Sequence, residues 1–296
     1  SQDITRKGGV TELGLSFAAN YNHKLYIGAT VGVDFLSYDE DRIYEESADS
    51  IDFQYLQFSE NRNVRGTGIN LKLGLIYRIN KMLRFGLSIH TPTAYRLVDS
   101  YNTGLSAQIV YDSLLQQSDY SMEDQDPFVV QHNFYSPWVF SGSLGMLIFK
   151  RAFIGVDVQY LDYSWTEFTL LENDRTTSNL SFMDDLNQRV KSQYKAVLKV
   201  KVGAEVALGI ARIRLGYQFE SSPYQISIPG VSDVRHDISA GFGVRWKHFF
   251  LDLGYVHSIR DFDYVPYVSP TLVQQSTAEA QRGHFMVTFG ASMFRS

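Results

Sequence analysis

The sequence has no cysteine, no long apolar run and no excess of basic residues, and each absence removes a class of protein. Without cysteine, the chain has neither a disulfide framework nor a thiolate metal site. No stretch approaches the roughly 18 uninterrupted apolar residues of a membrane-spanning helix, so a helical membrane protein is excluded. A formal net charge of -5 offers no basic surface for nucleic acid, and we expect no nucleic-acid partner.

Signals of catalysis are also missing. The sequence contains no G-x-S-x-G nucleophile motif and no His-x-x-x-His pair. The segment Gly66-Thr67-Gly68 does not extend into a dinucleotide-binding loop, because Leu71 stands where the third glycine should be. We therefore predict no enzyme activity, no catalytic residue, no cofactor and no metal site.

Strict alternation of apolar and polar residues is the main feature that is present. In the clearest run, one face is apolar and the other is polar or small: Ile69, Leu71, Leu73, Leu75 and Tyr77 against Asn70, Lys72, Gly74 and Arg78. Soluble strands cluster at about 5 to 6 residues, whereas a strand tilted across a bilayer needs about 9 to 11. The length of the alternation predicts an all-β fold, an antiparallel transmembrane β-barrel with lipid outside and a polar interior.

Eleven candidate strands share this alternation. They span about residues 10 to 20, 24 to 38, 66 to 80, 82 to 110, 133 to 149, 152 to 165, 188 to 207, 212 to 221, 235 to 246, 249 to 258 and 283 to 294. Tight turns alternate with long loops, the long ones being 39 to 65, 113 to 132, 166 to 187 and 261 to 282. Short turns at one rim and long loops at the other are typical of an outer-membrane barrel, with the short turns in the periplasm.

The polar face of these strands predicts the lining of the lumen, since a charge facing lipid at the midplane costs about 2 to 4 kcal/mol. Seven basic residues on this face are candidate substrate-path residues for a ligand with a carboxylate headgroup: Lys72, Arg84, His90, Lys199, Lys201, Arg214 and Arg245. Acidic residues are interspersed with them: Asp157, Glu205, Glu220 and Asp252. The alternative is that these charges form paired ladders that stiffen the wall. Glycines on the same face would leave room for a plug or a substrate path.

The odd strand count carries a topological prediction. Bacterial single-chain barrels close with an even number of strands and keep both termini in the periplasm. If the last strand descends into the periplasm, an odd count places Ser1 at the outer surface. We therefore expect residues 1–296 to form one barrel domain that is the C-terminal part of a larger barrel. Strands 10 to 20 and 283 to 294 would then pair with a separate N-terminal segment, because unpaired backbone in lipid costs several kcal/mol per group.

Five segments of the sequence carry a family resemblance: residues 66–78, 83–93, 136–138 with 142–144, 156–163, and 214–217 with 221–224. They resemble the FadL-type outer-membrane transporters of hydrophobic compounds and long-chain fatty acids, in the form typical of Bacteroidetes. The resemblance implies fourteen strands and an N-terminal hatch, so that three strands and the hatch would be absent here. It also implies a wall opening for lateral release in the strand that would precede Ser1. Four residues would border this exit: Leu13, Ser16, Ala18 and Ala19.

Two functions follow as hypotheses. The leading one is passive transport of hydrophobic or amphipathic small molecules, such as fatty acids, across the outer membrane of a Gram-negative bacterium. The alternative is a structural or accessory barrel in an outer-membrane assembly or secretion complex, with a closed lumen and an outer wall that docks other proteins. The expected partners are membrane lipid, lipopolysaccharide, a hydrophobic ligand, the separate N-terminal segment and, for the alternative, other outer-membrane proteins.

Overall fold

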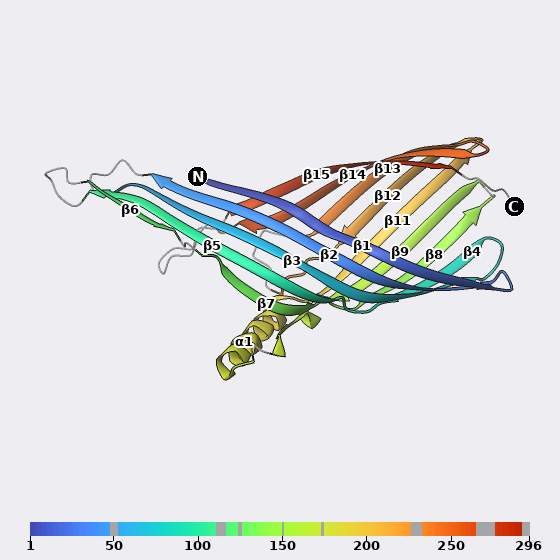
Figure 1. Cartoon of the computed structure of the whole chain (residues 1–296). Helices are drawn as coiled ribbons and strands as arrows, with labels where there is room; N and C mark the ends of the chain where they lie inside the picture. The colour runs from blue at the N-terminus through green and yellow to red at the C-terminus, as the bar shows by residue number, and fades with distance from the viewer. Residues whose placement is uncertain are drawn as a thin grey trace.

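The computed structural model describes residues 1–47, 53–110, 117–123, 126–149, 151–172, 175–225, 233–264 and 276–291. Within these residues, fifteen strands join in one antiparallel sheet that curves around a hollow (Figure 1). The strands are β1 (Gln2–Tyr21), β2 (Leu25–Ser47), β3 (Phe53–Arg78), β4 (Leu83–His90), β5 (Ala94–Val110), β6 (Gln117–Glu123), β7 (Phe128–Tyr135), β8 (Val139–Ile148), β9 (Ala152–Asp162), β10 (Glu167–Leu170), β11 (Ala196–Leu208), β12 (Ala211–Glu220), β13 (Arg235–Arg245), β14 (Phe249–Tyr264) and β15 (Ser276–Ala291). A 3-10 helix, η1 (Tyr163–Trp165), and one α-helix, α1 (Thr177–Gln193), lie between β9 and β11.

Several strands continue one another, so that the described residues form eleven strand positions across the sheet. β4 and β5 share one position, because both pair with the same edge of β3. β6, β7 and β8 share the next, since β6 and β7 pair with β5 and β8 pairs with β4. β9 and β10 form the third composite position, pairing with β8 and β7. The eleven positions match the eleven predicted strands.

Prolines mark two of the interruptions within these positions. Pro92 separates β4 from β5, and Pro137 separates β7 from β8. Proline cannot donate a ladder hydrogen bond, and neighbouring groups bridge the gap: the Thr93 N–H donates to Ser136 Oγ (2.8 Å) and the Ser136 N–H donates to the Thr93 carbonyl (3.2 Å). The wall therefore continues across both prolines.

Tight turns gather at one rim, as predicted. The turns that join β1 to β2, β3 to β4, β8 to β9, β11 to β12 and β13 to β14 lie on the right of Figure 1, and Ser1 lies toward the other rim. In the first turn, Asn22 and His23 both have φ of 51°, which is the left-handed backbone that a type I′ hairpin turn requires.

The prediction of a loop over residues 39 to 65 is wrong, because most of this region is strand. β2 continues to Ser47 and β3 begins at Phe53. Together with β5, β6, β7 and β10, the parts of β1, β2 and β3 beyond the barrel form a protruding sheet, here called the extension (residues 1–11, 35–47, 53–67, 94–110, 117–123, 128–135 and 167–170; Figure 1). The predicted loops 113 to 132 and 261 to 282 are likewise partly strand, in β6, β7, β14 and β15. Alternation of one polar and one apolar face does not mark residues 39 to 65, because charged side chains lie on both faces here: Arg65 pairs with Asp39 on one face and Arg62 with Asp99 on the other.

The region between β9 and β11 was also predicted incorrectly. The expected loop over 166 to 187 contains β10 and most of α1, and the expected strand over 188 to 207 begins only at Ala196. Met183 and Val190, seven residues apart, are buried on one face of α1. Asn187 attaches the helix to β10, since its side chain both donates to the Phe168 carbonyl and accepts from the Phe168 N–H at 2.9 Å. No helix in the described part of the chain is long and apolar enough to cross a membrane.

The first and last strands leave the described sheet with two unpaired edges. β1 pairs with β2 and β15 pairs with β14, and no described pairing joins β1 to β15. Outward side chains on these edges are the more exposed ones, with Leu13 at 69% and Phe285 at 83%, against 48% for Leu144 in the middle of the wall. That a separate N-terminal segment covers these edges stays a prediction.

Candidate functional site: the inner wall of the barrel

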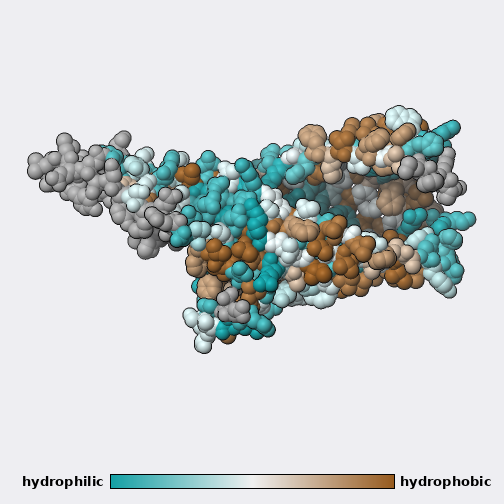
Figure 2. All heavy atoms as spheres, in the orientation of Figure 1, coloured by the Kyte–Doolittle hydropathy of each residue, from teal (hydrophilic) through white to brown (hydrophobic). Residues whose placement is uncertain are grey.

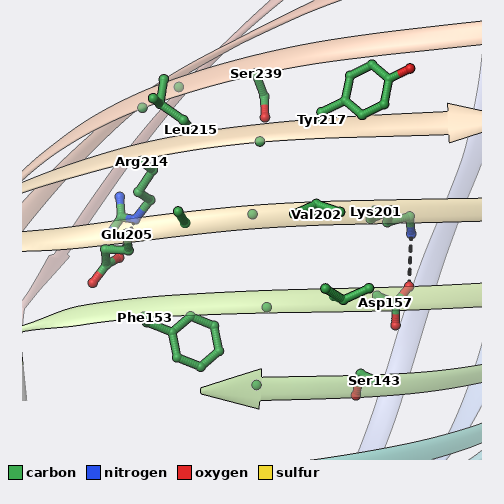
Figure 3. A pocket seen from close by; sticks show the side chains of 18 of the residues that line it. Ser143, Phe153, Asp157, Lys201, Val202, Glu205, Arg214, Leu215, Tyr217 and Ser239 are labelled. Carbon is green, nitrogen blue, oxygen red and sulfur yellow. Dashed lines mark hydrogen bonds and ion pairs between the residues drawn. The ribbon is translucent and has the colours of Figure 1, made fainter. Parts of the chain in front are cut away.

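Side chains alternate across the barrel wall between an apolar outer face and a polar inner face. Figure 2 shows apolar residues concentrated over the barrel and hydrophilic ones over the extension and the barrel rim. On the inner face lies a cavity of about 810 Å³, with a wall built from β4, β8, β9 and β11 to β15 (Figure 3). The inner wall and this cavity are the candidate site.

A row of four directly opposed glycines crosses the wall of the cavity. Gly145 lies opposite Gly155, Gly155 opposite Gly203, and Gly203 opposite Gly216. The ring of Phe153 covers one end of the row, where a Cβ atom added to Gly145 would lie only 2.9 Å from it. Because glycine presents no side chain, the row keeps the centre of the wall hollow.

Strand register sets the ion pairs beside this row. Lys201 lies directly opposite Asp157, with Nζ 3.8 Å from Oδ1 (Figure 3). Lys199 lies directly opposite Glu220, with Nζ 3.1 Å from Oε2. Two of the predicted path residues are therefore paired with carboxylates on neighbouring strands.

A larger ionic network spans β11 to β14. The Arg214 guanidinium donates from Nε to Glu205 Oε2 (2.6 Å) and from Nη1 to Asp252 Oδ1 (2.8 Å). Arg245 donates from Nη2 to the other oxygen of Asp252 (3.1 Å), and its guanidinium carbon lies 4.6 Å from the ring centroid of Phe250. One carboxylate thus joins two predicted path residues across adjacent strands.

The remaining path residues differ in their partners. Lys72 donates from Nζ to Glu12 Oε1 at 2.6 Å, and His90 lies directly opposite Lys72. Arg84 lies on the wall of the cavity, and no ion pair joins it to another described residue. The charge-paired ladders given above as the alternative are present, and a substrate path through them remains a prediction.

The predicted lateral-exit residues all lie on β1. Leu13 and Ala19 are on the outer face, whereas Ser16 and Ala18 are on the inner face. The hydroxyl oxygens of Ser16 and Thr30 are 2.8 Å apart, a hydrogen bond that ties β1 to β2. An opening at this place would use the free edge of β1, and its existence stays a prediction.

The outer face carries a groove that the sequence analysis missed. It has a volume of about 980 Å³ and an almost entirely apolar lining from β1, β2, β3, β4, β8 and β9. Small outward residues form its floor, including Ala19, Ala29 and Gly142, and Phe140 and Tyr160 flank it. Alternation alone predicts uniform lipid contact for this face. The small residues at outward positions were the signal that could have revealed the groove.

An aromatic cluster lies beside this groove, where the barrel meets the extension. Trp138 stacks on Phe140 at a centroid distance of 6.3 Å, and Trp165 packs edge-on against Phe140 (6.5 Å) and Tyr160 (6.2 Å). Tryptophan and tyrosine are enriched at membrane interfaces, where one end of the side chain is apolar and the other is wet. The cluster therefore marks the outer edge of the membrane-embedded wall.

Cross-strand charges also connect the strands of the extension. Arg6 Nε lies 2.6 Å from Glu40 Oε2, and Arg42 bridges Glu40 Oε1 (2.9 Å) and Glu60 Oε2 (3.1 Å). Burial, together with a hydrogen bond to Glu60, raises the pKa of Tyr101 to about 12. These contacts fix β1, β2, β3 and β5 to one another beyond the barrel.

Antiparallel strands long enough to cross a bilayer, an apolar outer face and ion pairs along the inner face are typical of the wall of an outer-membrane β-barrel. The chain belongs to the BamG family, whose family model matches residues 1–252.

Solved structures with a similar fold agree with this class. The CymD monoaromatic hydrocarbon channel matches with a TM-score of 0.59 at 12% identity, covering 98% of this chain and 77% of that chain. The toluene transporter TbuX of Ralstonia pickettii matches with a TM-score of 0.58 at 12% identity, covering 98% of this chain and 69% of that chain. The expected likeness to FadL-type barrels is thereby confirmed for the fold. No curated protein matches the chain in sequence.

Proposed function

We propose that this chain is an accessory barrel subunit of the outer-membrane barrel-assembly (Bam) complex of a Gram-negative bacterium. The observation that carries the proposal is membership of the BamG family across residues 1–252, since the family name points to that complex. In this role the chain performs no catalytic step, and its outer wall and extension are the surfaces that meet other proteins.

The length of the strands supports a role outside the membrane. β2 has 23 residues and β3 has 26, whereas about 9 to 11 residues suffice to cross a bilayer. The surplus forms the extension, whose strands are held by cross-strand ion pairs such as that between Arg6 and Glu40. A stable sheet that projects beyond the membrane is a surface suited to protein contacts.

The outer groove supports the same role within the membrane. Small residues such as Ala29 and Gly142 allow close approach of another apolar surface, which favours packing between membrane proteins. The aromatic cluster around Trp138 extends this surface toward the extension.

Purification of the full chain from its native membrane tests the proposal. Tagged protein extracted in mild detergent should carry barrel-assembly proteins in a fixed ratio, measured by mass spectrometry and native electrophoresis. Ala29→Trp fills the groove and should release these partners. Ala240→Trp is the matched control, because Ala240 is exposed on the outer face of β13, away from the groove. Recovery of the chain without barrel-assembly proteins would contradict the proposal. If the Ala29→Trp variant keeps its partners, the groove is not the surface that binds them.

The fold supports a second candidate, passive transport of hydrophobic or amphipathic small molecules such as fatty acids. The similar structures are channels for aromatic hydrocarbons, and Arg84 is a cation of the cavity wall that could attract a carboxylate. Liposomes that contain the barrel should then take up labelled fatty acid faster than empty ones. Arg84→Gln should slow fatty acid but not toluene, and Lys247→Gln at a turn is the control. Uptake equal to that of empty liposomes would contradict transport.

A further inference from the structure

Four strands bring a polar cluster together on the inner wall, just below the extension. Glu12 of β1 lies directly opposite Asp34 of β2, and Asp34 belongs to the same row as Tyr95 of β5. Asn70 and Lys72 of β3 complete the cluster, which lies outside the lining of the 810 Å³ cavity.

Two oxygen atoms in this cluster are buried without a hydrogen-bond partner. Asp34 is 5% exposed and Asn70 is 6% exposed, and neither Asp34 Oδ1 nor Asn70 Oδ1 receives a hydrogen bond. The other oxygen of Asp34 accepts from the Tyr95 hydroxyl at 2.7 Å and from Asn70 Nδ2 at 3.4 Å. A buried acceptor left without a donor costs roughly 1 to 3 kcal/mol, and more when it is charged. Each of the two free oxygens therefore lacks a hydrogen-bond donor or a cation.

The charge balance of the cluster also lacks a cation. Lys72 binds both oxygens of Glu12, whereas no ion pair joins Asp34 to any described residue. A buried carboxylate without a counter-ion is strongly disfavoured, and buried charges are normally paired or bind metals. Two carboxylates and one ammonium leave the cluster one positive charge short.

Glycine makes the close approach of these oxygens possible. A Cβ atom at Gly32 would lie 2.6 Å from Asn70 Oδ1 and 3.0 Å from Glu12 Oε2, so no other residue fits there without displacing them. Another glycine, Gly14, lies directly opposite Gly32, and a Cβ atom there would lie 3.8 Å from Glu12 Oε1. The glycine backbone of β2 thus lets oxygen atoms from β1 and β3 approach each other closely.

We propose that Asp34, Asn70 and Glu12 bind a calcium ion on the inner wall of the barrel. Carboxylate and amide oxygens are the ligands of hard divalent cations, and Ca²⁺ accepts six to eight oxygens in irregular geometry, whereas Mg²⁺ demands a nearly ideal octahedron. Glu12 and Lys72 are about 30% exposed, so the lumen can supply water ligands and the Lys72 ammonium can turn into it when the ion binds Glu12.

Sequence motifs could not indicate this site. No group of three or more His, Cys, Asp or Glu side chains in the described chain is placed to hold a metal, and here the third ligand is an amide. The three ligands lie on three different strands, and only the pairing register brings them together. The ion would supply the missing charge and fasten β1, which has a free edge, to β2 and β3.

Calcium binding to the purified full chain tests the proposal. After removal of metals with a chelator, calorimetric titration should give one Ca²⁺ per chain. Tb³⁺ should bind in its place, show luminescence on tyrosine excitation because Tyr95 contacts Asp34, and be displaced by Ca²⁺. No Ca²⁺ binding at millimolar concentration, or tighter binding of Mg²⁺ than of Ca²⁺, would overturn the proposal.

Matched variants make the test specific. Asp34→Asn should weaken Ca²⁺ binding at least tenfold, whereas Asp157→Asn removes a lumen carboxylate that is paired with Lys201 and should leave binding unchanged. Equal weakening by both would contradict the site.

A second variant decides the question should Asp34→Asn fail to fold. Asn70→Asp adds a third carboxylate, so it should bind Ca²⁺ more tightly and unfold at a higher temperature with Ca²⁺ than without it. Without a cation site, the added charge would lower the unfolding temperature equally in both conditions. These readouts involve neither partner proteins nor transport and are independent of the proposed function.

Discussion

The barrel wall and the extension share strands but distribute charge differently. β2 and β3 pass through both regions. In the barrel, charged side chains lie on the inner face, whereas in the extension Arg65 pairs with Asp39 on one face (2.8 Å) and Arg62 with Asp99 on the other (3.0 Å). Lipid forbids charge on one side of a strand and water permits it on both. The surrounding solvent, more than strand propensity, therefore decides the pattern along one continuous strand.

The largest expected effect comes from moving a charge across this boundary. Leu73→Arg places a guanidinium on the outer face of the barrel part of β3 and should cost about 2 to 4 kcal/mol, because lipid cannot solvate it. Ile43→Arg is the matched change on the extension, where an outward side chain meets water, and should have little effect. The folded fraction is measured by urea titration in lipid vesicles.

Gly74→Arg is the control for position along the strand. Gly74 is the inward neighbour of Leu73, and no atom lies within 4 Å of a Cβ atom added there, so the arginine should be tolerated. Similar losses for Leu73→Arg and Ile43→Arg would mean that the two regions do not differ in solvent.

The barrel could be predicted from the sequence because lipid imposes a strict pattern. Residues such as Leu73 and Lys72 alternate along the membrane-spanning part of β3, with Ile76 as an apolar residue on the inner face, and every predicted strand has a counterpart in the sheet. The β2 and β3 part of the extension was predicted as a loop, because Asp39, Glu40 and Asp41 are charged in succession, which no lipid-facing strand allows.

The sequence predicts which face of a strand a residue lies on, but not which residue it contacts on the neighbouring strand. The inner-face position of Lys201 follows from alternation, but its pairing with Asp157 depends on the register between β9 and β11, with α1 and β10 between them in the chain. The helix α1 was missed although its sequence carries a signal, since Leu180, Met183, Leu186 and Val190 are spaced three or four residues apart, as on one face of a helix.

Removing one charge of an ion pair should cost more stability in the barrel wall than in the extension, and both losses should be smaller than that of Leu73→Arg. Glu205→Gln removes the acceptor charge of a network in which Arg214 and Glu205 are both 32% exposed, and should cost about 1 to 2 kcal/mol. Asp39→Asn removes the partner of Arg65 on the more exposed extension, and should cost less than about 1 kcal/mol. Urea unfolding in vesicles measures both, and an equal or larger loss for Asp39→Asn would contradict the distinction.

The extension should also respond to acid. Burial alone would raise the pKa of Glu40, but hydrogen bonds from Tyr38 and Arg6 outweigh it and lower the pKa. A lowered carboxylate pKa contributes stability above the unfolded value of about 4.3, and that contribution is lost as the pH falls through the folded value. The protection of amides in the extension, taken relative to the intrinsic exchange rate at each pH, should therefore fall below about pH 4.3, by no more than about 1 kcal/mol of local stability. Glu40→Gln should abolish this dependence, and an unchanged pH profile in that variant would exclude Glu40 as its source.

The last comparison concerns the side of the membrane on which each region lies, and it needs no change in stability. The chain has no cysteine, so a single introduced thiol reports one position. Glu45 is exposed near the tip of the extension, and Lys247 is exposed in the tight turn between β13 and β14 at the opposite rim (Figure 1). Because short turns of outer-membrane barrels face the periplasm, an impermeant maleimide should label Glu45→Cys on intact cells and Lys247→Cys only after the outer membrane is opened. Labelling of Lys247→Cys on intact cells, with Glu45→Cys protected, would invert the barrel and place the extension in the periplasm.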